Sequence, residues 1–372
     1  MNVIGSRLLA RLEAARTATR DPIERACLRA EHAGYRARQG HCDEARAELS
    51  ALHAQFERQP HPAVSAWLCL AEGWVALQGS VAALAHDRFK RAHALSVAAG
   101  LTRLQALSAA WLAHLNHAHR HIDAMARHTI EALRLAGPTD HGARSRACLV
   151  VAQAYEFAER SDLAQPWYGR ARERAQLDGD DQTLGALVHD LAWYSAKHTL
   201  QSAIFGSDAR EAARRALARV EAAENFDAWA GGGAPHPRLP TLRALIASVQ
   251  GDFAQALAHH ERQRDAAERR GLEPTAADVL ADRAWCRWHA GDTDGAALEA
   301  DTVLAQLDAV MHDDVRAVAH GRLAQLFAVL KRFEAGAAQR RIAEAAWARH
   351  RSEQQHVVEA LERAGLPAAV SA

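Results

Sequence analysis

Apolar residues recur along this chain at the spacing of an α-helix, and short turns interrupt them at nearly regular intervals. Each turn phrase has a small or turn-forming residue, a polar residue and then an apolar one. The clearest copies begin at Gly40, Gly251 and Gly291, and weaker ones lie at Gly79–Val81, Arg120–Ile122, Ser161–Leu163 and Lys331–Phe333. The copies begin about 40 residues apart, except that the interval between the copies at 161 and 251 is about twice as long. A fixed period of this size indicates a stacked helical array.

The segments between the turns predict helices, because β-branched clusters with a period of two are missing. A leading helix at about 5–18 and a trailing helix at about 352–364 are expected to cap the array. Between them we expect eight helix pairs at 22–39 with 42–58, 63–78 with 81–99, 102–119 with 122–136, 141–159 with 162–177, 181–200 with 207–225, 238–250 with 253–270, 275–290 with 293–310, and 313–330 with 333–350. The predicted fold class is therefore all-α, a solenoid of about eight antiparallel helix pairs.

One stretch breaks this rhythm. Residues 226–240 contain three consecutive glycines and three prolines, which oppose a helix through the middle of the stretch. We therefore predict repeats 1–5 with the leading helix in 1–225, a Gly/Pro-rich loop in 226–240, and repeats 6–8 with the trailing helix in 241–372. The loop is either a linker between two halves of the solenoid or a binding loop, since long loops are often functional.

Composition narrows the partners and the compartment. Lys+Arg and Asp+Glu both number 45, so no net field attracts nucleic acid or an anionic membrane. Five dispersed cysteines form no disulfide or zinc pattern, which fits a reducing compartment. The N-terminus does not read as a signal peptide, and no apolar run is long enough to cross a membrane. The expectation is a soluble cytoplasmic protein.

The second repeat carries the residues of a known family. Gly73 in its first helix is followed by Ala85, Phe89 and Ala92 in its second helix. The chain thus resembles a tetratricopeptide repeat (TPR) protein. Its longer period is similar to that of MalT-type bacterial regulators and of the repeat regions that precede diguanylate cyclase domains. The resemblance implies a right-handed superhelical solenoid that acts as a binding scaffold, with a peptide or partner helix held against its concave surface.

That resemblance also implies which side chains form the groove, because the family presents the first helix of each pair there. Carried over to this sequence, the groove positions include Trp67, Trp74, His114, His117, His189, Trp193, Lys197, Trp285 and Trp288. Tryptophans at helical spacing also pack between helices, so the alternative interpretation is that these tryptophans are core residues. Trp285 and Trp288 share one helix face, and aromatic anchors of this kind often dominate binding energy.

Histidine is unusually frequent, with 22 residues. Within 114–121, His114, His117 and His121 come nearest to a metal motif, since imidazoles one turn apart can bind zinc or nickel. The alternatives are surface histidines without a role and a partner- or pH-sensing function. No phosphate-binding, dinucleotide-binding or nucleophile-elbow motif occurs, so we expect no catalytic residues, no metal and no cofactor.

Two functions follow from these patterns. The first is a non-enzymatic interaction scaffold or sensory module that binds a peptide, a protein helix or a small effector, in bacterial signalling if the resemblance extends that far. The alternative is a metal-dependent hydrolase that uses the His114/His117/His121 cluster. Homodimerisation through an uncovered terminal repeat is a further expectation.

Overall fold

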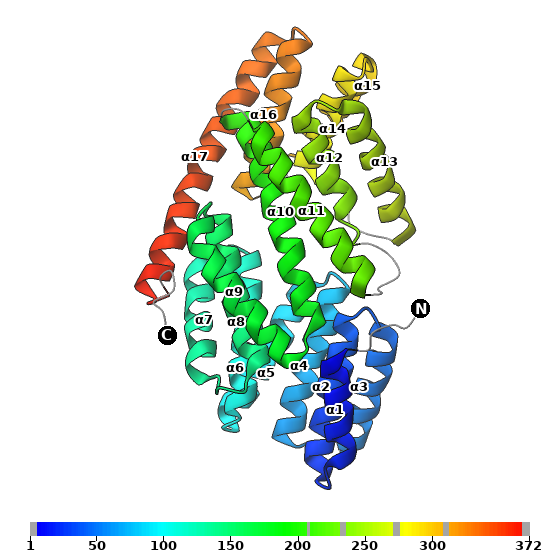
Figure 1. The fold of residues 1–372 in the computed structure, drawn as a ribbon, viewed down its shortest axis with the longest axis vertical. Coiled ribbons are helices and arrows are strands. Elements are labelled where there is room, and N and C mark those ends of the chain that lie inside the picture. Colours follow the sequence, from blue (N-terminus) through cyan, green and yellow to red (C-terminus); the bar gives the residue numbers. More distant parts are fainter. Residues whose placement is uncertain (1–5, 207–208, 231–235, 271–275, 308–311, 367–372) are drawn as a thin grey trace. The chain divides into compact units, whose positions relative to one another are not determined.

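The structure is a computed structural model that describes residues 6–206, 209–230, 236–270, 276–307 and 312–366. Every regular element in these ranges is an α-helix, and neighbouring helices pack as antiparallel pairs (Figure 1). The described residues therefore have an all-α, TPR-like helical repeat fold. None of the described helices is long and apolar enough to cross a membrane.

Most helix bounds follow the predicted pairs closely, but the helix expected at 181–200 ends at Phe205 and the one expected at 207–225 ends at Ala230. The helices are α1 (Arg7–Ala18), α2 (Pro22–Arg38), α3 (Cys42–Phe56), α4 (Pro62–Gln78), α5 (Ala82–Ala98), α6 (Thr102–Ala118), α7 (Ile122–Leu135), α8 (His141–Phe157), α9 (Ser161–Asp178), α10 (Asp181–Phe205), α11 (Arg210–Ala230), α12 (Leu239–Gln250), α13 (Phe253–Arg270), α14 (Ala277–His289), α15 (Thr293–Gln306), α16 (Asp313–Val329) and α17 (Phe333–Arg363).

The chain divides into two compact units. Unit 1 comprises Met1–Leu187 and His356–Ala372, and unit 2 comprises Val188–Gln355. The borders between the units fall inside α10 and α17, whereas the sequence suggests a division at the Gly/Pro-rich stretch. Helix α11 continues through Ala230 into that stretch, and residues 231–235 lie outside the described ranges.

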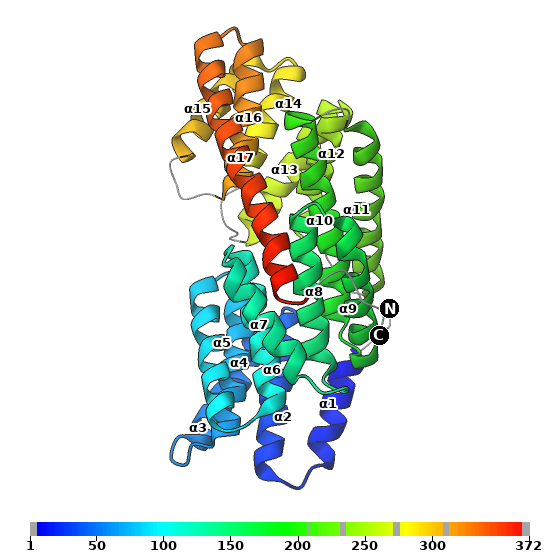
Figure 2. The ribbon, with the colours of Figure 1, turned by 90° about the vertical axis from the view of Figure 1, so that its left-hand side faces the viewer.

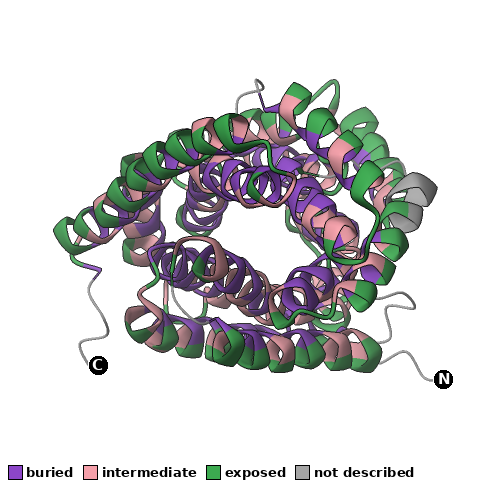
Figure 3. Ribbon diagram, turned by 90° about the horizontal axis from the view of Figure 1, so that it is seen from above, coloured by how far each residue is buried: buried purple, intermediate pink, exposed green. Residues whose placement is uncertain are grey.

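Within each unit, the two helices of a repeat pack on each other and on the next repeat. First helices also pack on first helices: α2 lies against α4, α6 against α8, and α14 against α16. Second helices carry exposed residues along their outer side, whereas first helices such as α8 are buried almost all round (Figure 3). This is the packing of a repeat array, in which neighbours bury each other's apolar faces.

The family-like residues of the second repeat form the closest contact between its helices. Ala85, Phe89 and Ala92 of α5 are fully buried. A Cβ atom on Gly73 of α4 would lie 2.3 Å from Phe89 Cε1, which is too short for a carbon–carbon contact. Glycine at this position thus lets the Phe89 ring pack directly on the backbone of α4.

The recurring turn has one geometry throughout the described chain. One residue in each turn has a positive φ, and these residues are Gly40, Ser80, Arg120, Glu159, Gly251, Gly291 and Lys331. The N–H of the following residue donates to a carbonyl five residues back, as in His41 to Arg36 and Val81 to Ala76, both at 3.0 Å. This is the Schellman ending of a helix. In the second repeat the left-handed residue is Ser80, and Gly79 before it has a φ of −82°.

The trailing helix is a continuation of the last repeat. Helix α17 runs unbroken from Phe333 to Arg363, so the segment expected at about 352–364 is its final part (Figure 2). No glycine or proline lies between 337 and 363 to end the helix. Its last residues belong to unit 1, where the hydroxyl of Tyr155 in α8 donates to the Leu366 carbonyl at 2.8 Å.

Candidate functional site

The first helices of unit 1 surround a pocket. Residues of α2, α4, α6 and α8 line it, together with α1, the end of α9 and the start of α10. The lining residues are Leu8, Leu12, Glu31, Tyr35, Arg38, Trp74, Leu107, Trp111, Gly142, Arg146, Asp178, Asp180 and Thr183. The cavity itself has a volume of about 30 Å³, and the empty space counted together with the part open to solvent measures about 390 Å³. First helices are the elements that the sequence assigns to a concave binding surface.

Trp111 of α6 lines this pocket and has two guanidinium groups over its ring. The Cζ atom of Arg146 is 4.2 Å from the ring centroid, and that of Arg38 is 5.2 Å from it. Trp74 packs edge-on against Trp111, with 5.7 Å between ring centroids. The attraction of cations to an indole face stabilises this stack by roughly 0.5–2 kcal/mol per pair.

Asp180 anchors Arg38. Its carboxylate oxygens accept hydrogen bonds from Arg38 Nη1 at 3.0 Å and from the Tyr35 hydroxyl at 2.6 Å. The Thr183 hydroxyl also donates to Asp180, at 2.7 Å. Burial alone would raise the pKa of Asp180, but Arg38, Tyr35 and Thr183 outweigh it and lower the pKa to about 2. The carboxylate is therefore charged and holds the Arg38 guanidinium in a fixed orientation.

The two other carboxylates of the lining have arginine partners from outside it. Arg103 Nη2 donates to Glu31 Oε1 at 2.7 Å, and Arg11 Nη2 donates to Asp178 Oδ1 at 2.6 Å. Arg146 Nη2 lies 3.3 Å from the Thr183 hydroxyl oxygen, to which it donates. The acidic lining residues are therefore charge-compensated, and Arg38 and Arg146 present cationic, aromatic-stacked surface to the pocket.

Helix α1 forms one side of the pocket. Leu8 and Leu12 are buried and pack with Tyr35 of α2. The Leu8 N–H donates to the Gly179 carbonyl at 3.3 Å, and Arg7 Nη2 donates to the Gln176 carbonyl at 2.8 Å. The leading helix α1 thus packs on α2 of the first repeat and also contacts the end of α9.

Four predicted groove residues lie in unit 1. Trp74 lines the pocket, while Trp67 is buried in α4 with the Arg103 Cζ atom 5.5 Å from its ring centroid. His114 meets the edge of Trp111 at 5.6 Å, and His117 is buried against Phe157 at 6.5 Å, both measured between ring centroids. Burial lowers the pKa of each imidazole to about 3, with a further contribution from Arg146 for His114 and from Arg120 for His117.

Three more predicted residues lie on α10 in unit 2. His189 Nε2 is 2.8 Å from Asp227 Oδ1. Trp193 has the Lys197 Nζ atom 5.3 Å from its ring centroid, and Lys197 is buried in an ion pair with Asp278 of α14. These side chains form a continuous polar–aromatic row on one helix face, as their spacing of four residues requires.

Trp285 and Trp288 of α14 lie beside each other in unit 2. Their rings stack with 6.1 Å between centroids, and both are half-buried against the apolar cluster of α14–α16. The Arg322 Cζ atom lies 5.4 Å from the Trp285 ring centroid. The nine predicted groove residues therefore fall into two sets, one in each unit, and their role in binding stays a prediction.

The structure does not bring His114, His117 and His121 together. Among the described residues, the groups whose ligand atoms lie within reach of one metal ion are His93/His128/Glu131 and His260/Asp282/Cys286. His121 is exposed at the start of α7, where it stacks on His119 with 6.0 Å between ring centroids. The geometry expected for the metal-dependent hydrolase is therefore absent from the described residues.

Sequence reasoning missed the charged residues of the pocket. Arg38, Arg146 and Glu31 lie on the face of a first helix that otherwise packs apolar side chains, which is the signal that could have identified them. Asp180 precedes the first residue of α10, where an acidic side chain is typical of a helix cap. It caps α10 by accepting from the Thr183 N–H at 2.9 Å, and it binds Arg38 as well.

The fold and the pocket define a class of protein: a helical-repeat protein with a polar–aromatic pocket on its first helices. Among solved structures, the chain is similar to a Rap protein complexed with competence and sporulation factor. The TM-score is 0.53 at 11% identity, and the match covers 89% of this chain and 100% of that chain. At this identity the match shows the fold. No protein-family model and no curated protein matches the chain.

Proposed function

We propose that this chain is a non-enzymatic regulatory module that binds a short peptide or a small effector against the first helices of unit 1, with a polar group of the ligand at the pocket. The observation that carries the proposal is the pair of guanidinium groups stacked over Trp111 within a pocket built from first helices. The Rap protein of similar fold was solved in complex with competence and sporulation factor, which supports a regulatory binding role.

The lining specifies the chemistry of the ligand. Both terminal nitrogens of Arg38 donate to Asp180 or Thr183, so Arg146 is the lining cation that we expect to attract a carboxylate. Trp74 and Trp111 give the same lining an apolar part. A peptide C-terminus or an acidic side chain beside an apolar one combines both features. The ligand that fits this lining is therefore amphiphilic and carries at least one carboxylate.

Purified protein, used as bait in an extract of the source organism, tests this proposal. Peptides and small molecules retained by the wild type are identified by mass spectrometry and compared with those retained by an Arg146→Met variant. Arg172→Met is the matched control, because Arg172 is exposed on α9. The carboxylate ligand is expected on the wild type and the control. Its affinity for Arg146→Met should fall about 10- to 100-fold, as for the loss of a charge-assisted hydrogen bond.

A second variant distinguishes this site from the predicted groove of unit 2. Trp285→Ala with Trp288→Ala should leave capture by the pocket unchanged. If capture depends on those tryptophans and is indifferent to Arg146, the proposal is wrong and the binding surface lies on α14. Circular dichroism of each variant verifies that the helices remain intact.

We also propose that the protein is located in the reducing cytoplasm. All five cysteines are free, three of them buried, as expected for a protein of a reducing cytoplasm. Burial raises the pKa of Cys148 to about 11, so this thiol is protonated and unreactive at neutral pH. The three buried cysteines therefore act as small apolar core residues in this proposal.

A further inference from the structure

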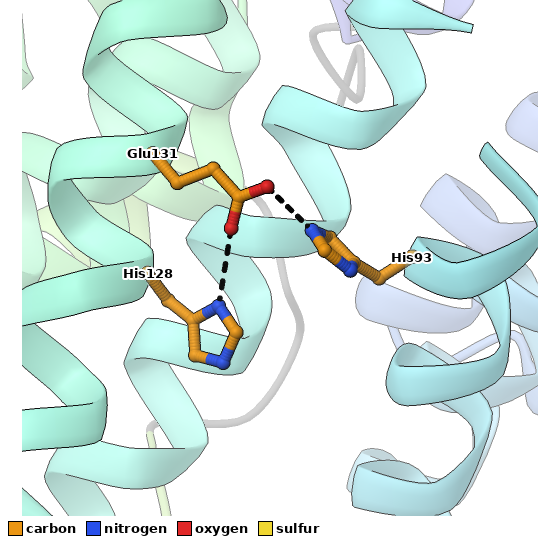
Figure 4. Close-up of side chains that lie close together, drawn as sticks. All are labelled: His93, His128 and Glu131. Carbon is orange, nitrogen blue, oxygen red and sulfur yellow. Dashed lines mark hydrogen bonds and ion pairs between the residues drawn. The ribbon is translucent and has the colours of Figure 1, made fainter. Parts of the chain in front are cut away.

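A polar cluster lies on the second helices of repeats 2 and 3 in unit 1. His93 extends from α5, and His128 and Glu131 extend from α7, one helical turn apart (Figure 4). His93 Nε2 lies 2.9 Å from Glu131 Oε1, and His128 Nδ1 lies 3.5 Å from Glu131 Oε2. Two imidazoles from different helices thus converge on one carboxylate, each facing a different oxygen.

We propose that His93, His128 and Glu131 form a binding site for a divalent transition-metal ion, with Zn²⁺ as the best match. Two imidazole nitrogens and one carboxylate oxygen are the ligands that zinc takes when a fourth position is left to water. Tetrahedral bonds of about 2.0–2.2 Å place ligand atoms about 3.3–3.6 Å apart. The three ligand atoms here lie within 4.8 Å of one another, so small side-chain rotations complete the site.

His128 Nδ1 supplies an independent indication of a ligand. This nitrogen is inaccessible to solvent, and no hydrogen bond to it from the described residues satisfies ordinary geometry. Its 3.5 Å distance from Glu131 Oε2 is long for a hydrogen bond. A buried polar atom without a good partner is costly, and coordination to a metal would remove that cost.

The surroundings of Glu131 also fit a metal site. Gln105 Nε2 of α6 donates to Glu131 Oε1 at 2.8 Å, which is the role of an outer partner that orients a ligand. The side chains of His93, His128 and Glu131 are 18%, 25% and 23% exposed. An ion can therefore reach the site from solvent and retain a water molecule.

The other close group, His260/Asp282/Cys286 in unit 2, is a weaker candidate. Its carboxylate already accepts a hydrogen bond from Arg322 Nε at 2.8 Å, and that guanidinium supplies the positive charge. Burial strongly raises the pKa of the Cys286 thiol, whereas metal binding requires a thiolate. The His93/His128/Glu131 cluster has neither obstacle.

Titration of untagged, metal-free full-length protein with Zn²⁺, followed by competition with a chromophoric chelator, tests the proposal. One Zn²⁺ per chain is expected at this site. His93→Ala and His128→Ala should each weaken it by more than about 100-fold, because loss of an outer partner alone costs about 10- to 100-fold. Gln105→Ala should fall in that lower range. Cobalt bound to the wild type should show the visible absorption of a four-coordinate ion.

The neighbouring histidines provide the matched control. His86, His119 and His121 lie close together, with 6.3 Å and 6.0 Å between successive ring centroids, and could bind metal adventitiously. Their triple replacement by alanine should leave the tight site intact. The proposal is overturned if Zn²⁺ does not bind, or if binding survives both His93→Ala and His128→Ala. Loss of binding only in the triple variant would also overturn it. Circular dichroism controls for folding, and the Arg146→Met variant should bind Zn²⁺ normally.

Discussion

At the residue scale, the repeating turn depends on a left-handed backbone conformation at one position. Glycine occupies this position in three of the seven turns of the described chain, while Ser80, Arg120, Glu159 and Lys331 occupy it in the others. An L-residue with a side chain pays about 1–2 kcal/mol for this conformation. The weaker copies of the turn phrase are therefore turns that retain the geometry at a cost in stability.

We expect glycine and serine substitutions at two equivalent turns to change the stability of the protein in opposite directions. Ser80→Gly should raise the free energy of unfolding by about 0.5–1 kcal/mol, because relief of the left-handed strain exceeds the added entropy of the unfolded chain. Gly40→Ser, at a φ of +92°, should lower it by a similar amount. Chemical denaturation of both variants measures the effect. Equal signs for the two changes would contradict the interpretation.

At the element scale, small residues set how closely the two helices of a repeat approach. Gly73 of α4 meets the ring of Phe89, and Ala85 and Ala92 flank that ring on α5. These positions are buried in the largest apolar cluster of unit 1, which joins α2 through α6. The same close packing aligns successive first helices, and these helices position Trp74, Trp111 and Arg146 around the pocket.

Gly73→Ala should destabilise the protein by about 1–3 kcal/mol, because the added methyl group overpacks the helix interface. Gly169→Ala in α9 is the matched control. A Cβ there meets nothing within 4 Å, so alanine should stabilise by up to about 1 kcal/mol through helix propensity. Thermal unfolding, monitored by circular dichroism, compares the stabilities of the two variants. A neutral Gly73→Ala would show that α4 and α5 tolerate a wider separation.

At the scale of the whole molecule, both units contain imidazoles that burial keeps neutral. His114 and His117 in unit 1 and His260 in unit 2 have pKa values lowered to about 3, with burial as the largest cause. In the unfolded chain a histidine has a pKa of about 6.5. Between these two values the unfolded state binds protons that the folded state does not, so acid favours unfolding.

Stability should therefore be highest above about pH 6.5 and fall as the pH decreases toward 3, by up to about 1.4 kcal/mol per pH unit for each such histidine. Replacing His117 with leucine removes one of these groups. The His117→Leu variant should lose less stability than the wild type between pH 7.5 and 5.5. Denaturation curves at both pH values measure the difference, and an unchanged slope would mean that His117 is accessible to protons in the folded state.

The helix pairs were predictable because the turn signals and the helical period are local properties of the chain. Helix α2 begins at Pro22 after its Asp21 cap, and α6 begins at Thr102, both as the pattern indicates. The pocket was predictable only in part. First helices were expected to form the binding surface, and Trp74 lines it, but Arg38 and Arg146 reach Trp111 from other repeats. Contacts between residues this far apart in sequence cannot be predicted from the hydrophobic periodicity of the chain.

The amino-acid sequence by itself determined the helical class, the period of about 40 residues and most helix bounds, because each depends on neighbours within one or two turns. Tertiary structure decided which polar side chains converge. It separated His121 from His114 and His117, brought His93 to His128 and Glu131, and set Asp180 against Arg38. These groupings depend on how successive repeats pack, since packing alone sets the distance between side chains on different helices.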